Sequence, residues 1–436
     1  MREFFLKLNL FLIAFFVFAL GAYSKSAYVY NSEGIKYMEN KDYRNAVKSF
    51  EEAYSQDSDN EVIKQNLVYA YAALANEYAG KENWDKAVEY GKSALKFSSS
   101  KDRSLLKSNI SSYYSNYGNQ QYQDNYPDRA LYYFRRSLEY DKNNYAAFIG
   151  MGKINYDRGK LDEALSNWEK AVAINPGLDE IKGKIENLKK ENEMGKDFSK
   201  KSLWYFDVRY EGRKNEELAS IAVKILNRAY NDIGNDLKFY PKDKTTVIIY
   251  NKEQFQEATG RPDWIAGVYD GIIRIHAQDI KNSKVIENIL YHEYTHSLLY
   301  KKVGPSLPIW LNEGLAQAEE PQGRKLTREE FKILKESLDE GRYLTFEEMN
   351  KAFGANRDKD LVKQAYAQSK SIVAYMIERH HMFRINLILD NLKNGIDIDQ
   401  ALKKTLYVDS GDLLMAWEKW FKKENKTKSR VIISHD

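Results

Sequence analysis

The sequence predicts a mostly α-helical protein in which an N-terminal array of helical hairpins precedes an α+β domain. Two observations support this prediction. Small and aromatic residues recur at fixed offsets through residues 27–178, and short strand-like segments appear only after residue 200. With 436 residues, of which 43% are hydrophobic and 30% charged, the chain is long enough for more than one folded core.

Composition narrows the possible functions. The 67 Lys and Arg residues are nearly balanced by 63 Asp and Glu residues, and the net charge of +4 gives no reason to expect a nucleic-acid partner. The absence of cysteine excludes disulfides, thiolate metal sites and a thiol nucleophile. Any transition-metal site must therefore be built from histidines and carboxylates.

Residues 1–24 are predicted to be a signal peptide. A short basic start is followed by an uncharged run, Leu8–Tyr23, which is shorter than the roughly 20 residues that a spanning helix needs. Ala22 and Ser24 provide a small-x-small cleavage site. The alternative is an uncleaved N-terminal anchor, the one case in which we expect a membrane contact. In both cases the protein is expected to be exported, and to be periplasmic, envelope-associated or secreted.

Residues 27–178 contain a repeating pattern. A set of small and aromatic residues is matched 34 positions later, as Gly118, Ala130, Phe134 and Ser137 are by Gly152, Ala164, Trp168 and Ala171. Further copies begin near Gly34 and surround Ala87. These offsets resemble the tetratricopeptide repeat, a helix-turn-helix unit that stacks into an α-solenoid. The resemblance implies about four repeats that bind a protein partner. The many tyrosines of this region are interpreted as packing residues, and an aromatic peptide-binding groove is the alternative.

The segment after the repeats is predicted to be a capping helix and linker, residues 179–200. Ile181, Ile185 and Leu188 recur in it at helical spacing and would seal the last repeat.

Beyond residue 200 the pattern changes to short strands and then to helices. Strands are expected within 202–212 and 245–250, and a hairpin within 266–275, where Asp270 and Gly271 form a turn signal. A helix with two histidines comes next, and residues 327–424 are expected to be almost wholly helical. The domain is predicted to span residues 201–425, with a tail at 426–436.

His292 and His296 lie four residues apart on a predicted helix, in the sequence LYHEYTHSLLY. Side chains at positions i and i+4 share one helix face, so both imidazoles can bind one cation. Glu293 is rotated by about 100° from His292, beside the cation, where it can take a proton from an activated water. The alternative is a chance arrangement on an ordinary amphipathic helix.

A catalytic zinc site needs a third protein ligand and one open position. Glu313, in PIWLNEGLAQAEE, comes 17 positions after His296, with a glycine- and proline-containing break between them. That spacing permits a second helix that returns Glu313 to the histidine pair. The metzincin pattern fails, because Lys302 stands where its third histidine would be. We therefore expect one Zn²⁺ per chain, bound by two histidines and one glutamate.

From about Leu203 to Lys422 the sequence resembles the peptidase MA-like domain, a gluzincin-type zinc metallopeptidase of bacterial exported proteins. The resemblance is carried most specifically by LYHEYTHSLLYKKVG and PIWLNEGLAQAEE, and more softly by GRPDWIAGVYDGIIRI, AYAQSKSIVAYMIERH and LLMAWEKWF. It implies an α+β zincin-like fold with a small sheet and a helical C-terminal part. No Gly-x-Met-Glu-Asn segment is present, which favours an endopeptidase over an aminopeptidase.

The resemblance also implies roles for individual residues. His292, His296 and Glu313 would be the zinc ligands, and Glu293 the general base. Tyr366, in QAYAQS, would donate to the oxyanion of the tetrahedral intermediate, and core packing is its alternative role. Where many gluzincins have an acidic residue that supports a zinc histidine, this chain has Gln317, whose amide can still accept a hydrogen bond.

The sequence thus predicts an exported zinc-dependent metallopeptidase, expected to be an endopeptidase, whose repeats recruit a protein partner or substrate. An extended substrate is expected to add to the strand Gly271–Ile275 as the edge of the sheet. The rival hypothesis is a catalytically inactive envelope scaffold in which the repeats and a retained metallopeptidase fold mediate protein–protein interaction.

Overall fold

The computed structural model describes residues 26–212, 214–261, 265–276, 283–353 and 358–427. The described part of the chain divides into two compact units. One comprises the described residues up to 119 together with 132–147, and the other comprises residues 120–131 together with the described residues from 148 onward. The predicted signal peptide and nearly all of the predicted tail lie outside the described residues, and the predicted domain boundaries stay a prediction. None of the helices in the described part is both long and apolar enough to cross a membrane.

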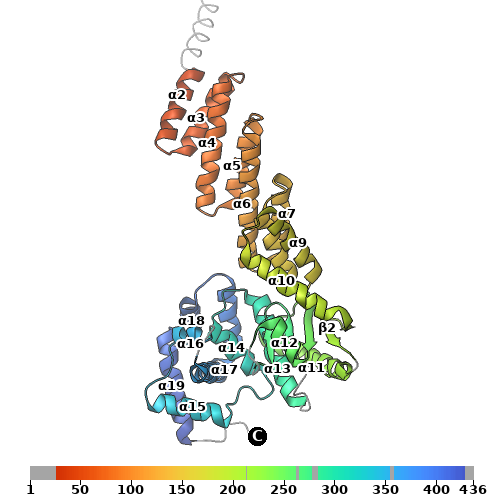
Figure 1. Cartoon of the computed structure of the whole chain (residues 1–436). Coiled ribbons are helices and arrows are strands. Elements are labelled where there is room, and N and C mark those ends of the chain that lie inside the picture. The colour runs from red at the N-terminus through yellow and green to blue at the C-terminus, as the bar shows by residue number, and fades with distance from the viewer. Residues whose placement is uncertain (1–25, 213, 262–264, 277–282, 354–357, 428–436) are drawn as a thin grey trace, which may run out of the picture. The chain divides into compact units, whose positions relative to one another are not determined.

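The first part of the chain consists of consecutive helical hairpins, as predicted (Figure 1). They are α2 (Ala27–Glu39) with α3 (Tyr43–Gln56), α4 (Glu61–Gly80) with α5 (Trp84–Phe97), α6 (Arg103–Gln123) with α7 (Pro127–Tyr140), and α8 (Tyr145–Asp157) with α9 (Leu161–Ile174). Each turn has one residue with positive φ, namely Lys41, Glu82, Asn125 and Gly159. The same backbone turn therefore recurs in every hairpin.

Glycine and aromatic residues 16 positions apart explain the close approach of paired helices. A Cβ added to Gly34 would lie 2.6 Å from the ring of Phe50, and one on Gly118 would lie 2.7 Å from Phe134. Only glycine leaves room for these rings, so the recurring small residues are packing positions of the repeat. α10 (Asp179–Met194) comes after the last hairpin and buries Ile181, Ile185 and Leu188, the residues predicted to face the repeat.

A five-stranded mixed sheet has the order β1-β2-β3-β5-β4. Its strands are β1 (Phe198–Ser202), β2 (Phe206–Glu211), β3 (Thr245–Tyr250), β4 (Gly267–Tyr269) and β5 (Ile273–His276). The central strands β2, β3 and β5 are parallel, and the antiparallel hairpin β4–β5 turns at Asp270 and Gly271 as predicted. The predicted edge strand is wrong, however. The segment Gly271–Ile275, predicted to be the edge, contains most of β5, which pairs with β4 on one side and with β3 on the other. The edge strand is therefore β4.

Both faces of the sheet are covered within the second unit. Val247, Ile249, Ile273 and Ile275 belong to the core that includes α11 (Lys214–Leu237) and α13 (Ser283–Val303). On the other face, Ile248, Tyr250 and Ile272 cluster with residues of α9, of α10 and of α12 (Lys252–Thr259). Successive side chains of β3 thus point to opposite faces of the sheet, and both sets are buried, as expected for a strand that is covered on both sides.

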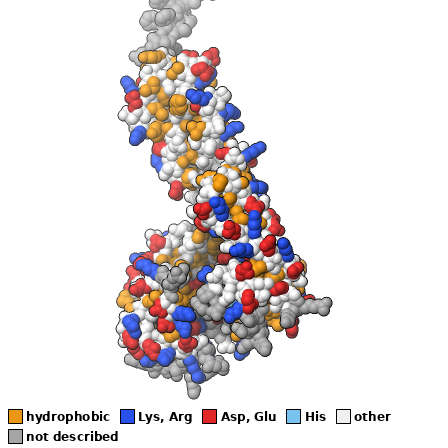
Figure 2. Space-filling view, in the orientation of Figure 1, with side chains coloured by type: hydrophobic (Ala, Val, Ile, Leu, Met, Phe, Trp, Pro, Cys, Tyr) orange, Lys and Arg blue, Asp and Glu red, His pale blue; other side chains and the backbone are white. Residues whose placement is uncertain are grey.

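The remainder of the described chain is helical, as predicted. Its elements are α14 (Ile309–Glu319), α15 (Arg328–Asp339), α16 (Phe346–Ala352), α17 (Lys359–Lys393), α18 (Ile398–Leu406) and α19 (Ser410–Thr427). α17 bends at His381, whose φ of 61° interrupts the helix. On the face displayed in Figure 2, basic and acidic side chains are interspersed, and neither sign forms a continuous patch.

Candidate metal centre and cleft

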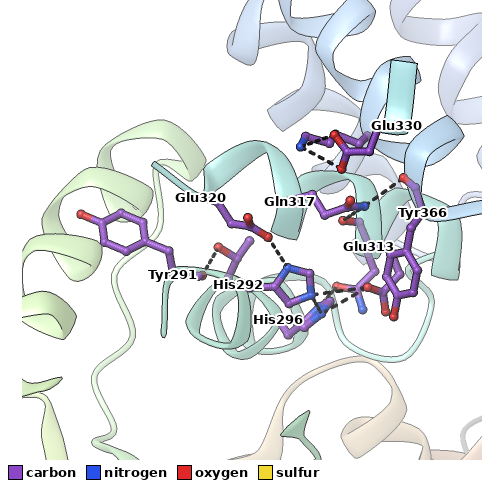
Figure 3. A network of polar contacts seen from close by, with 11 residues as sticks. Tyr291, His292, His296, Glu313, Gln317, Glu320, Glu330 and Tyr366 are labelled. Carbon is purple, nitrogen blue, oxygen red and sulfur yellow. Dashed lines mark hydrogen bonds and ion pairs between the residues drawn. The ribbon is translucent and has the colours of Figure 1, made fainter. Parts of the chain in front are cut away.

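Helices α13 and α14 bring the predicted ligands together. α13 buries Leu290, Tyr294 and Leu298 in the core, which turns His292 and His296 toward α14 (Figure 3). On α14 three apolar side chains predicted to hold the helix down are fully buried, namely Trp310, Leu311 and Leu315. The ring of Trp310 stacks on Phe346, with 4.2 Å between the ring centroids.

The three predicted ligands form a compact cluster. His292 Nε2 and His296 Nε2 are 3.1 Å apart, and Glu313 Oε2 lies 3.6 Å from each of them. Among the described residues this is the group of His, Asp and Glu side chains whose atoms could hold one metal ion. Ligand atoms bound tetrahedrally at 2.0–2.1 Å lie about 3.3 Å apart, so the observed spacing fits a small cation such as zinc.

Hydrogen bonds on the far side of each ring set the tautomers. His292 Nδ1 lies 2.8 Å from Glu320 Oε1, and His296 Nδ1 lies 3.0 Å from Asn312 Oδ1. Both partners are acceptors, so each Nδ1 carries the proton and donates it. Each neutral ring therefore has its lone pair at Nε2, directed into the cluster.

Three acceptor atoms consequently face one another. Two imidazole lone pairs meet Glu313 Oε2, which is buried and has no hydrogen-bond donor among the described residues. A buried carboxylate oxygen without a partner is costly, and a cation or a proton must compensate for it. The donor set, two imidazoles and one carboxylate, is one that zinc prefers. The residues present therefore fit a zinc ion.

The pKa values of these side chains also show that the cluster attracts positive charge when no cation is bound. Burial lowers the pKa of His292, but the nearby carboxylates of Glu313 and Glu320 outweigh burial and leave that pKa well above its usual value. Burial raises the pKa of Glu313, but the neighbouring histidines outweigh it and hold the pKa well below its usual range. The cluster therefore attracts positive charge, which is the property a metal centre requires.

Glu293 lies beside the cluster on α13 and is 7% exposed. Burial raises its pKa, and the histidines only partly offset that effect. Strand β4 packs against it, because a Cβ added to Gly267 would lie 2.9 Å from Glu293 Cγ. The carboxylate is therefore held between β4 and the histidine pair, with an enhanced affinity for a proton.

Tyr366 reaches the same cavity from α17. It lines the cavity together with Glu293 and Glu313, and its ring lies beside Glu313 in Figure 3. Burial, followed by the negative charges of these two glutamates, raises its pKa, so its hydroxyl stays protonated and can donate. The ring also makes an edge contact with Phe353. Tyr366 therefore packs against a neighbouring side chain and lines the cavity at the same time.

Gln317 does not support a histidine in the way its position suggested. Its Nε2 donates to the backbone oxygens of Glu313 and Tyr366, at 3.3 and 3.1 Å. The carboxylate that contacts His292 comes instead from Glu320, at the end of α14 (Figure 3). Glu320 and Asn312 are thus site residues that the sequence reasoning missed. Glu320 comes seven residues after Glu313, and that two-turn spacing on one helix face was the available signal.

The glycine directly after Glu313 also has a packing role. A Cβ on Gly314 would lie 2.6 Å from the backbone oxygen of Ser369 on α17 and equally close to Val373. Glycine therefore lets α14 lie against α17, one turn from Tyr366. This contact explains how a short Asn-Glu-Gly sequence places a ligand and the tyrosine on one cavity.

A cavity of 530 Å³ opens over the cluster. Its lining includes the three ligand residues, Glu293, Tyr366 and β4, together with apolar side chains of Ile265, Leu307 and Ile309. The volume is within the range of small-molecule and peptide side-chain sites. The cleft is therefore not filled by the helices of the described chain.

Comparison with known proteins supports the C-terminal assignment. Residues 225–423 match the family described as the Peptidase MA superfamily. The search of curated proteins found no match. Among solved structures, this chain is similar to YrrB, described as a TPR protein with an unusual peptide-binding site. That similarity has 19% identity and a TM-score of 0.23, covers 41% of this chain and 84% of that one, and is too low to support an inference. The family match and the observed hairpins show a Peptidase MA-like domain preceded by tetratricopeptide-type repeats.

Proposed function

We propose that the protein is a zinc-dependent metallopeptidase that hydrolyses internal peptide bonds. The observation that carries the proposal is the convergence of His292, His296 and Glu313 on one point, beside the buried carboxylate of Glu293 and under an open cavity. The match of residues 225–423 to a peptidase superfamily supports it.

Zinc held by His292, His296 and Glu313 would polarise the scissile carbonyl and lower the pKa of an attacking water. Glu293 would accept the proton of that water and return it to the departing amine, a task for which its raised pKa suits it. The Tyr366 hydroxyl would donate to the carbonyl oxygen as negative charge develops there. Edge strand β4 would align the substrate backbone through ladder hydrogen bonds.

Export and partner binding are part of the same proposal. Residues 1–24 have the composition of a signal peptide, so we place the protein outside the cytoplasm, in the periplasm, at the envelope or secreted. The hairpin array offers a surface for a protein partner or substrate, as stacked helical repeats commonly do.

The test is metal content and hydrolysis of residues 25–436, with three variants. We expect one zinc per chain in the wild type and its loss in His296→Ala. Glu293→Gln is expected to keep zinc and to lose hydrolysis of an unfolded protein substrate by at least roughly a hundredfold. His380→Ala, which removes a histidine of α17 that does not line the cavity, is the matched control and should keep both.

Two results would contradict the proposal. Absence of zinc from the wild type would remove the metal centre, and hydrolysis by Glu293→Gln at the wild-type rate would remove the base. Zinc without hydrolysis of any peptide would favour the inactive scaffold.

A further inference from the structure

Helix α8, the first helix of the last hairpin, forms one end of the cavity over the metal centre. Lys153 and Asp157 of α8 line that cavity together with Tyr269, Tyr300 and His296. The repeat array therefore contributes side chains to the proposed catalytic cleft. A role for these side chains in choosing the substrate rests on the proposed peptidase function of that cleft.

Close packing fixes α8 at this position. The tip of the β4–β5 hairpin lies on the end of α8, because a Cβ on Gly271 would be 3.1 Å from Asp157 Oδ1. Tyr300, one turn after His296 on α13, donates to Asp157 Oδ2 at 3.3 Å. The tip of the edge strand and the metal-binding helix thus both contact α8, so its side chains have a defined place relative to the site.

Lys153 brings a positive charge to the cavity, and the carboxylates of Asp157 and Glu180 interact with this charge electrostatically without forming an ion pair. Its Nζ lies 4.9 Å from the centroid of the Tyr122 ring, a contact that orients the ammonium without neutralising it. No carboxylate of the described residues lies within ion-pair distance of this Nζ. Asp157, one turn further along α8, is close enough for the charge of Lys153 to lower its pKa, and its carboxylate accepts hydrogen bonds from Tyr122 and Tyr300. The ammonium is exposed and remains available to a ligand in the cavity.

The path from the metal centre to Lys153 is short enough for one peptide. β4 begins at Gly267, which touches Glu293, and ends at Tyr269, whose ring lies 6.2 Å from that of Tyr300. A peptide beside β4 advances about 3.3 Å per residue. A residue roughly two to four positions from the scissile bond would therefore reach the α8 end of the cavity.

We propose that Lys153 forms a carboxylate-binding subsite of the cleft, and that the preferred substrates are peptides with a carboxylate two to four residues from the cleaved bond. The carboxylate is supplied by an Asp or Glu side chain or by a free C-terminus. Lys153 acts on substrate selection and not on the bond-breaking step, so the last repeat helps to define specificity.

Peptide series test this subsite. In C-terminally amidated peptides, Glu, Gln or Lys is placed at each of four positions on either side of one cleaved bond, and a parallel series ends in a free carboxylate. At one position, or with the free terminus, the wild type should cleave the acidic peptide roughly tenfold faster in kcat/KM than its Gln counterpart. Lys153→Met should abolish this preference, and Lys153→Glu should transfer it to the Lys peptide.

Two controls separate specificity from structure. Lys107→Glu makes the same change of charge at an exposed position of α6, outside the lining of both cavities that Lys153 lines, and should keep the wild-type preference. Binding of the same peptides to Glu293→Gln, with and without Lys153→Glu, should show the same reversal by fluorescence anisotropy.

The outcomes distinguish failure of the proposed peptidase function from failure of the carboxylate-binding subsite. If the wild type cleaves no peptide, the proposed function fails and this inference fails with it. If cleavage occurs but is indifferent to the acidic residue, or if Lys153→Glu keeps the acidic preference, only the carboxylate subsite is overturned. Reversal of the preference with unchanged thermal stability supports it, and the series that shows the reversal identifies the source of the carboxylate.

Discussion

Replacing Glu320 with Ala should weaken metal binding more than any change at Gln317. Glu320 Oε1 accepts a hydrogen bond from His292 Nδ1 at 2.8 Å, and both side chains are only about one-fifth exposed (18% and 20%). The contact fixes the tautomer that directs the Nε2 lone pair at the cation, and the negative charge makes the ring a better ligand. Without the Glu320 carboxylate, the His292 ring can rotate, or it can carry its proton on Nε2, where the proton would block metal binding.

The expected magnitude can be worked out from this contact. Loss of a carboxylate that supports a ligating histidine typically reduces metal affinity 10- to 100-fold, which corresponds to about 1.4–2.7 kcal/mol. Gln317→Ala should change the affinity less than about threefold, because Gln317 donates to backbone oxygens and not to a ligand. The loss of zinc affinity in Glu320→Gln should lie between the losses in Glu320→Ala and Gln317→Ala, since an amide oxygen still accepts a hydrogen bond but carries no charge.

The assay is competition for zinc with a chromogenic chelator, on protein first stripped of metal. Circular dichroism and the urea midpoint of each metal-free variant show whether a loss of affinity reflects unfolding. Equal zinc affinity in the wild type and Glu320→Ala would refute the reasoning, and so would a larger loss in Gln317→Ala.

Three further predictions concern the surroundings of the site. Gly267→Ala should lower kcat while keeping zinc content, because the new methyl group displaces the Glu293 carboxylate; unchanged kcat by peptide hydrolysis would contradict this. Glu191→Ala should destabilise the fold by about 3–5 kcal/mol, because it removes the buried carboxylate that pairs with the Arg274 guanidinium and leaves only the half-exposed Asp270 carboxylate; urea denaturation measures this loss, and a loss below about 1 kcal/mol would contradict it. Burial raises the pKa of Glu319 from 4.5 to about 8, so folding takes up a proton between these values and the free energy of unfolding should fall as pH rises from 4.5 to 8. Glu319→Gln should flatten that decline in denaturation series, and an equal decline in both proteins would refute the assignment.

The sequence predicted the parts of the fold that depend on local periodicity. The hairpin repeats are encoded by glycine and aromatic residues 16 positions apart, which the structure brings into contact, as in the pair Gly34 and Phe50. The β4–β5 turn is encoded by Asp270 and Gly271. The edge strand was predicted wrongly because a hairpin pattern is symmetric. Which of its two strands lies outside depends on the pairing of β5 with β3, a contact between distant segments.

In the site, too, residues set by local sequence spacing could be predicted, whereas residues placed by contacts between distant segments could not. His292 and His296 were identifiable because their spacing places them on one helix face, and Glu313 because it lies in a recognisable segment. The support from Glu320 depends on where α14 ends, and that end is set by tertiary packing. Lys153 carried no signal at all, because its relation to the cleft exists only through the contact of α8 with the β4–β5 hairpin.

The last repeat is physically part of the fold that holds the cleft. Arg274 on β5 is 2% exposed and bonds at once to Glu191 on α10, to Tyr156 on α8 and to Asp270 at the hairpin turn. A buried guanidinium is tolerated only when such partners are all in place, so α8, α10 and the hairpin must assemble together. The hairpin carries β4, and β4 holds Glu293. A change in the packing of α8 would therefore move both the proposed specificity residue and the strand that supports the proposed base.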